Sequence, residues 1–152
     1  MFIRIGISLV VIVITIIIHG YGSSFWIGYQ TRHFELSKHK WSLRHSVRVL
    51  VSSAVFLILL HIIEIIIWAV LYLNLPDLNV LKTFEEAAYF SLVTYTTLGY
   101  GDITLGPTWR VLSGFEAING MMLIGWSTAM FYSVVKNVSQ KYRSDKNQDL
   151  KK

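Results

Sequence analysis

Three long apolar stretches dominate the sequence and restrict what it can fold into. A helix that crosses the roughly 30 Å hydrocarbon core of a bilayer needs about 20 mostly apolar residues. The stretches are Ile5–Ile18, which Met1–Ile3 and His19–Tyr21 extend to spanning length, Val47–Leu73, and Val111–Val135. Charged residues make up only 15% of the chain and the mean hydropathy is +0.50, whereas soluble proteins carry about 25% charged residues. We therefore expect an all-α membrane protein with three transmembrane helices.

The composition also excludes several classes of function. A chain of 152 residues allows one compact domain, which excludes a two-domain soluble enzyme. The absence of cysteine excludes a disulfide framework, a thiolate metal site, an iron–sulfur cluster and a cysteine nucleophile. The net charge of +5 does not imply a nucleic-acid partner, because in a membrane chain the distribution of charge matters more than its sum. We expect no catalysis and no cofactor, and membrane lipids as partners.

The segment between the second and third stretches, residues 83–102, is too polar and too short to cross a membrane and return. It still carries an apolar helical face, formed by Phe84, Ala87, Ala88, Phe90 and Leu92. Thr83 with Glu86 three positions later matches a capping box, so a short helix is predicted to begin near Phe84 and to end at Thr94 or Thr96. We interpret the segment as a re-entrant loop.

The basic residues predict the orientation of the chain, because short cytoplasmic loops carry an excess of Lys and Arg. Eleven of the 14 basic residues lie in the loop before the second stretch or in the tail. They are Arg32, Lys38, Lys40, Arg44, Arg48, Lys136, Lys141, Arg143, Lys146, Lys151 and Lys152. Both segments are therefore expected in the cytoplasm, with the N-terminus and the re-entrant loop outside, most simply in the cell (inner) membrane. A cleaved secretory signal is the alternative for the first stretch, but no Ala-x-Ala-like site follows it.

The most informative motif is residues 96–102, which read Thr-Thr-Leu-Gly-Tyr-Gly-Asp directly after the predicted short helix. The carboxyl end of that helix carries partial negative charge, which favours a cation. In an extended strand beside an axis, the carbonyls of residues 97–100 can replace the hydration shell of a potassium ion. Aiming successive carbonyls the same way requires positive φ values, which Gly99 and Gly101 reach without a Cβ clash.

This motif resembles the selectivity filter of potassium channels, whose pore unit is outer helix, pore helix, filter and inner helix. The resemblance covers about residues 47–136. Leu98 departs from the usual valine or isoleucine, and Val93 stands where some bacterial members have a glutamate that braces the filter aspartate. We therefore expect Asp102 to rely on Tyr89 instead.

The resemblance implies a homotetramer that conducts K⁺, since one chain supplies one filter strand and neither a second Gly-Tyr-Gly nor an internal repeat is present. It implies K⁺ sites at Thr97, Leu98, Gly99 and Tyr100, continued by Gly101, with filter support from Tyr89, Val93, Thr96 and Asp102. The predicted organisation is an N-terminal transmembrane helix at 1–21, a basic cytoplasmic loop at 22–46, a pore domain at 47–136 and a tail at 137–152. Within the pore domain the outer helix is expected at 47–73, the pore helix at 83–96, the filter at 97–102 and the inner helix at 109–136.

Helical spacing after Gly120 predicts the face of the inner helix that lines the cavity. Its members are Met121, Ile124, Gly125, Thr128 and Tyr132, with Tyr132 near the cytoplasmic constriction. Gly120 falls where the resembled family often has a pivot glycine. The glycines of this helix can also serve close helix packing, and the two readings remain open.

Ionisable side chains within the spans form a further candidate cluster, because burying them in a membrane is costly. His61 and Glu64 share one face of the outer helix, and Glu116 and Asn119 share one face of the inner helix at a similar depth. We favour a polar clasp between the outer helix, the inner helix and the base of the pore helix. The alternative is that protonation of Glu64, Glu116 or His61 shifts gating. A metal or haem site from His19 and His61 is disfavoured, because His19 is placed at a span end and no second ligand is spaced to match.

Four other expectations concern regulation and the first span. No span carries Arg or Lys at every third position, so a voltage sensor is not expected. The tail is expected to be disordered or extended. The basic loop, with His33, His39, Trp41 and His45 among its charges, is expected mainly to fix topology, with binding to anionic lipid as the alternative. The first span is expected to pack outside the outer helix.

Rival functions are a weakly selective cation channel and a non-conducting scaffold or regulatory subunit with a pore-like fold.

Overall fold

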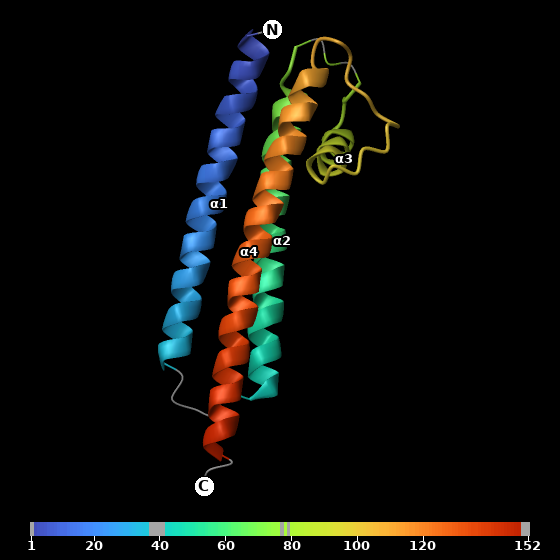
Figure 1. The fold of residues 1–152 in the computed structure, drawn as a ribbon. Helices are drawn as coiled ribbons and strands as arrows, with labels where there is room; N and C mark the ends of the chain where they lie inside the picture. The colour runs from blue at the N-terminus through green and yellow to red at the C-terminus, as the bar shows by residue number, and fades with distance from the viewer. Residues whose placement is uncertain (1, 37–41, 77, 79, 150–152) are drawn as a thin grey trace.

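The protein is a bundle of three long helices with one short helix packed at one end of it (Figure 1). The computed structural model describes residues 2–36, 42–76, 78 and 80–149. Within them lie α1 (Phe2–Leu36), α2 (Leu43–Leu73), α3 (Phe84–Tyr95) and α4 (Arg110–Asp149), and these described residues contain no strand. The expected all-α fold is confirmed. Three spans of sufficient length and hydropathy to cross a membrane are present, at Phe2–Arg32, Leu43–Leu73 and Arg110–Ser144.

The N-terminal end of the chain and α3 lie at the same end of the bundle, and the C-terminal end lies at the other (Figure 1). The guanidinium of Arg4 in α1 sits 5.5 Å from the ring centroid of Trp109, just before α4. Trp109 Nε1 in turn donates to the Pro76 carbonyl, 3.0 Å away, just after α2. These contacts join the start of α1 to the segments that flank the short helix.

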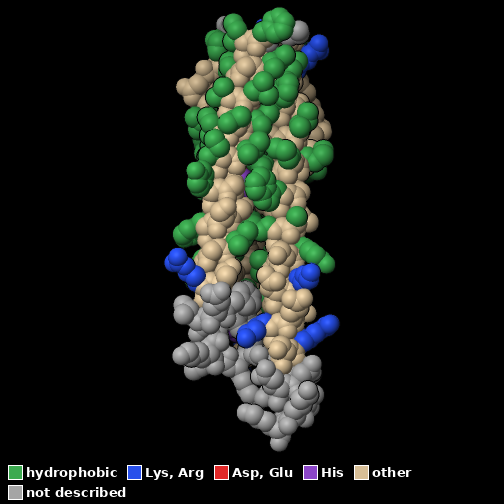
Figure 2. Space-filling view, turned by 60° about the vertical axis from the view of Figure 1, so that its left-hand side comes forward, with side chains coloured by type: hydrophobic (Ala, Val, Ile, Leu, Met, Phe, Trp, Pro, Cys, Tyr) green, Lys and Arg blue, Asp and Glu red, His purple; other side chains and the backbone are tan. Residues whose placement is uncertain are grey.

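The outer surface of the bundle is apolar along most of its length. Figure 2 shows many hydrophobic side chains over the upper part of one face, with most of the visible Lys and Arg side chains toward the lower end. On α2 the exposed side chains include Val51, Val55, Ile58, Leu59, Ile62 and Ile66. An apolar exterior of this length is what lipid requires, so the chain is a multi-pass membrane protein.

α1 is longer than predicted and also contacts α4. It is predicted to end at residue 21, with residues 22–46 as a loop, but the helix continues to Leu36. Trp26 Nε1 and Gln30 Nε2 both lie within hydrogen-bond distance of Ser53 Oγ in α2, at 3.1 and 2.8 Å. These bonds hold the more polar second half of α1, residues 22–36, against α2. We attribute the helical conformation of this half to that packing. α1 packs against the outer helix α2, as expected, and it also contacts α4 through Thr15 and His19, which the sequence does not predict.

The other long helices also extend beyond their predicted ends. α2 begins at Leu43 instead of 47, where Ser42 Oγ caps the helix by accepting from the His45 amide. α4 continues past 136 to Asp149, so the disordered or extended tail is wrong for residues 137–149. Val138 is buried and packs with Val134 and Val49, and Lys and Gln are favourable helix formers.

Several basic-loop and tail predictions fall outside the described residues. They concern Lys38, His39, Lys40, Trp41, Lys151 and Lys152, together with the side chains of His33 and Lys146.

The principal core lies where α3 meets α2 and α4. Trp68, Ala69 and Tyr72 of α2, Ala87 and Tyr95 of α3 and Leu112 of α4 are all at most 1% exposed. Tyr72 and Phe90 meet edge to face, with ring centroids 5.1 Å apart. This packing fixes the short helix relative to the long ones, and thereby positions the segment that follows it.

Candidate functional site: the segment after α3 and the buried polar networks

The start of α3 is fixed by the predicted capping box. Thr83 Oγ1 accepts from the Glu86 amide, and the Glu86 carboxylate accepts from the backbone N–H groups of Lys82 and Thr83 at 2.7 and 3.0 Å. Because those N–H groups stabilise the charged form, they hold the pKa of Glu86 below its ordinary value. The capping box and the predicted extent of the helix are confirmed, since α3 runs from Phe84 to Tyr95.

The chain leaves α3 in a backbone conformation that alternates in handedness. Thr97, Gly99 and Gly101 have φ values of 59°, 58° and 78°. The positive φ values predicted for the two glycines are confirmed, and Thr97 adds a third that the sequence analysis does not predict. A β-branched residue rarely adopts this region, at a cost of about 1–2 kcal/mol. Because every second residue is inverted, the carbonyls of residues 97–101 can be aimed toward one side.

Backbone hydrogen bonds tie this segment to the last turn of the helix. The amides of Leu98 and Gly99 both donate to the Val93 carbonyl, at 2.9 and 3.2 Å, and the Thr97 amide donates to the Thr94 carbonyl at 2.9 Å. Thr96 Oγ1 donates to the Leu92 carbonyl. Val93 therefore supports the segment through its carbonyl, whatever its side chain. Leu98 and Tyr100 are 55% and 67% exposed in the single chain.

Tyr89 braces Asp102 as the sequence predicts. The Tyr89 hydroxyl donates to Asp102 Oδ2 at 2.7 Å. This hydrogen bond holds the pKa of Asp102 below its ordinary value, because it stabilises the carboxylate. The bond spans the segment from α3 to the end of the motif, so it closes the loop on itself.

α4 meets the end of α3 at Gly120. A Cβ added there would lie 2.0 Å from the Tyr95 carbonyl oxygen, so only glycine permits this approach. The observation favours the packing reading of Gly120 over a hinge. The face predicted to line a cavity, Met121, Ile124, Gly125, Thr128 and Tyr132, is exposed in the single chain. The opposite face, with Leu123, Ser127 and Met130, is buried against the bundle.

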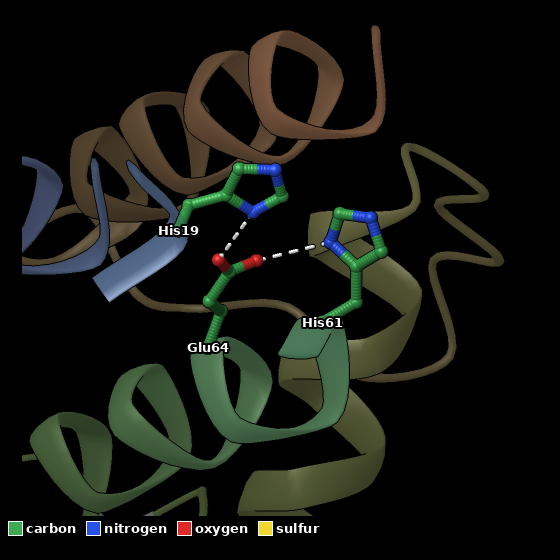
Figure 3. Close-up of side chains that lie close together, drawn as sticks. All are labelled: His19, His61 and Glu64. Carbon is green, nitrogen blue, oxygen red and sulfur yellow. Dashed lines mark hydrogen bonds and ion pairs between the residues drawn. The ribbon is translucent and has the colours of Figure 1, made fainter. Parts of the chain in front are cut away.

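The predicted polar cluster divides into separate networks. Glu64 Oε1 lies 2.8 Å from His19 Nδ1 of α1, and Glu64 Oε2 lies 3.0 Å from His61 Nδ1 (Figure 3). The Tyr95 hydroxyl, at the end of α3, donates to Glu64. Glu64 and His19 are fully buried. This network joins α1, α2 and α3 through Tyr95, which stands two residues before Thr97, the start of the filter-like loop (residues 97–102).

Glu116 has a different set of partners. The Tyr72 hydroxyl of α2 and the Ser91 hydroxyl of α3 both bond to its carboxylate. Asn119 instead donates from Nδ2 to Thr15 Oγ1 of α1, at 2.9 Å. The polar clasp therefore exists, and within it the two pairs at similar depth, His61–Glu64 and Glu116–Asn119, bond to separate partners. Each pair has hydroxyl or imidazole partners on other helices. Such partners supply hydrogen bonds to a buried carboxylate, whereas a second carboxylate nearby would add like charge.

Sequence reasoning missed the contribution of α1. His19 is expected at a span end, with no further ligand spaced to match it, yet it lies in the middle of α1 and meets both His61 and Glu64. The sequence pattern that could have predicted this contribution is a stripe of polar residues along one face of an otherwise apolar helix. Ser8, Thr15, His19, Ser23 and Gln30 repeat at helical spacing, and all are buried.

Comparison with known proteins identifies one matching family model, described as "Ion channel", over residues 52–137. The match includes α2 from residue 52 onward, the whole of α3, the segment after it, and α4 as far as residue 137. No curated protein and no solved structure matched the chain. α1 lies outside the matched range, although its buried polar residues complete the networks of the matched part.

Proposed function

The chain belongs to this ion channel family, whose model covers more than half of it, and we propose that it conducts K⁺ selectively and passively through a homotetrameric pore. The observation that carries the proposal is the alternating backbone at Thr97, Gly99 and Gly101, directly after a capped helix. A strand of this kind presents a row of carbonyl oxygens, which can replace the hydration shell of K⁺. The ion-binding residues are Thr97, Leu98, Gly99, Tyr100 and Gly101.

Four chains are proposed because one strand cannot surround an ion. The surfaces that a neighbour or a pore would cover are exposed in the single chain, as Leu98, Tyr100, Met121 and Tyr132 illustrate. In a symmetric ring the carboxyl ends of four α3 helices would converge on the axis, where their partial negative charges stabilise a cation. The cavity face of α4 and Tyr132 would then line the path toward the cytoplasm.

The proposed orientation places the N-terminus and the filter outside and the C-terminus in the cytoplasm, in the cell (inner) membrane. It follows from the basic residues, of which Arg32, Arg44, Arg48 and Lys136 lie toward the C-terminal end of the bundle. Arg4, Lys82 and Arg110 lie toward the end that carries α3.

The Gly99→Ala substitution tests the filter assignment. A Cβ at Gly99 meets no atom within 4 Å, so the φ of +58° is the reason that alanine is disfavoured there. We expect K⁺ efflux from proteoliposomes to fall to the level of empty vesicles in this variant. Gly106→Ala is the matched control, because Gly106 also has open space around it but no positive φ, and its efflux should match that of the unmodified protein.

Two results would contradict parts of the proposed function. Equal K⁺ efflux in the Gly99→Ala and Gly106→Ala variants would contradict the assignment of residues 97–101 as the filter. A mass other than that of four chains for the purified, conducting protein in native mass spectrometry would contradict the tetramer.

A further inference from the structure

His19, His61 and Glu64 bring three metal-ligating side chains together inside the bundle (Figure 3). His19 comes from α1, and His61 and Glu64 come from successive turns of α2. Each offers one ligand atom, and the three atoms lie within 4.8 Å of one another. Both imidazoles present the same ring nitrogen, Nδ1, to the carboxylate.

Two imidazole nitrogens and one carboxylate oxygen form a ligand set that zinc uses, with bonds of about 2.0–2.2 Å. Tetrahedral angles at such bond lengths separate neighbouring ligand atoms by about 3.3 Å. Here His19 Nδ1 lies 2.8 Å from Glu64 Oε1, and His61 Nδ1 lies 3.0 Å from Glu64 Oε2. Because one ligand atom from each residue lies within 4.8 Å of the other two, adjustment of these side chains would bring both nitrogens and one carboxylate oxygen around an ion.

The surroundings of the cluster are those of a metal site. Metal-bound histidine normally has its other ring nitrogen held by a hydrogen bond, and His19 Nε2 lies 3.3 Å from Ser127 Oγ of α4. The Tyr95 hydroxyl lies 3.0 Å from His61 Nδ1 and supplies a further oxygen. The side chain of His61 is 16% exposed while those of the other two ligands are fully buried, so an ion would enter past His61.

We propose that a divalent transition-metal ion of the zinc type binds between His19, His61 and Glu64. The site joins α1 to α2 beside Tyr95, which packs against Gly120 and stands two residues before Thr97. A bound ion thus holds α1 and the end of the pore helix together. Any effect of the ion on current rests on the proposed function, whereas binding itself does not.

The experiment measures Zn²⁺ binding to the purified full-length protein by equilibrium dialysis. The background carries His33→Gln, His39→Gln and His45→Gln, which leaves His19 and His61 as the chain's remaining histidines. We expect one Zn²⁺ per chain and an X-ray absorption spectrum with two imidazole ligands. His61→Gln keeps a polar side chain able to bond to Glu64, and should lower the affinity by more than about 100-fold, because outer-shell partners alone contribute about 10- to 100-fold.

Two further variants separate metal binding from helix packing. Ser127→Ala removes only the partner of His19 Nε2, and should weaken Zn²⁺ binding by about 10- to 100-fold without abolishing it. Thr15→Ala removes the hydrogen bond between Thr15 and Asn119 one turn away, which involves none of the ligands, and should leave Zn²⁺ binding unchanged. The absence of stoichiometric binding, or equal affinity in the His61→Gln variant, would overturn the proposal whether or not the protein conducts.

Discussion

At the scale of single residues, Tyr89 and Asp102 close the filter-like loop. Their hydrogen bond is 2.7 Å long and lies at the end of the molecule that carries α3. Because it lowers the pKa of Asp102, the bond contributes stability above the ordinary pKa of about 3.8, and that contribution is lost as the pH falls through the lower folded value.

Tyr89→Phe should therefore raise the pKa of Asp102 toward its ordinary value. The variant keeps the ring and removes only the hydroxyl that donates to the carboxylate. The pKa is measurable by carbon NMR titration of the Asp102 carboxyl group in the two proteins. An unchanged pKa of Asp102 in the variant would mean that Tyr89 does not brace the filter-like loop in solution.

Gly120 is the residue at which helix packing leaves no room. Gly120→Ala should lower the free energy of unfolding by about 1–3 kcal/mol, the usual cost of overpacking, because its Cβ would meet the Tyr95 carbonyl. Gly125→Ala on the same helix meets nothing within 4 Å, and should raise stability by up to about 1 kcal/mol through helix propensity. Thermal unfolding of both variants tests this difference, and equal midpoints would contradict the packing role.

At the scale of elements, the attachment of α1 to α2 and α4 is the feature with most consequence. Its middle and its second half are held by different contacts. In the middle, His19 contacts Glu64 and Ser127. In the second half, Trp26 and Gln30 bond to Ser53. Trp26 also stacks on Phe56 of α2, with centroids 4.4 Å apart. The second half of α1 is thereby part of the bundle and not a loop.

Ser53→Ala should loosen that second half. Ser53 is fully buried, and its loss leaves the Trp26 and Gln30 N–H groups without their acceptor, at a cost of about 1–2 kcal/mol. Hydrogen exchange of the amides after Trp26 should become faster. Ser52→Ala is the control, since Ser52 bonds only to the Val49 carbonyl of its own helix and should change nothing. Equal exchange in the two variants would contradict this view of α1.

The elements also illustrate what the sequence can predict. Local signals were sufficient for α3, whose capping residues Thr83 and Glu86 are close in sequence, and for the glycines of the filter-like loop. The extension of α1 and α4 depends on contacts between distant segments, such as Gln30 with Ser53 and Val138 with Val49, which hydropathy alone does not reveal. Thr97 is a similar case, because its positive φ is set by the neighbouring inverted residues and the hydrogen bonds to α3, against the preference of threonine.

At the scale of the whole molecule, the structure combines the region that matches the ion channel family with an additional helix, α1, whose polar side chains lie in the interior of the bundle. α3 and the filter-like loop lie at one end, and the exposed face of α4 leads away from them toward the C-terminal end. The carboxylate of Glu64 in α2 bonds to His19 of α1 and Tyr95 of α3. The carboxylate of Glu116 in α4 accepts from hydroxyl groups of α2 and α3. In a tetramer these networks would hold each pore helix at a fixed distance from the axis.

The selectivity of the pore is the central claim, and a reversal potential tests it most directly. The purified protein is placed in a planar bilayer with potassium on one side and sodium on the other, and the voltage at which the current reverses is recorded. A selective filter formed by residues 97–101 predicts reversal near the potassium equilibrium value. A clear current that reverses near zero would contradict it, and would indicate a weakly selective cation channel instead.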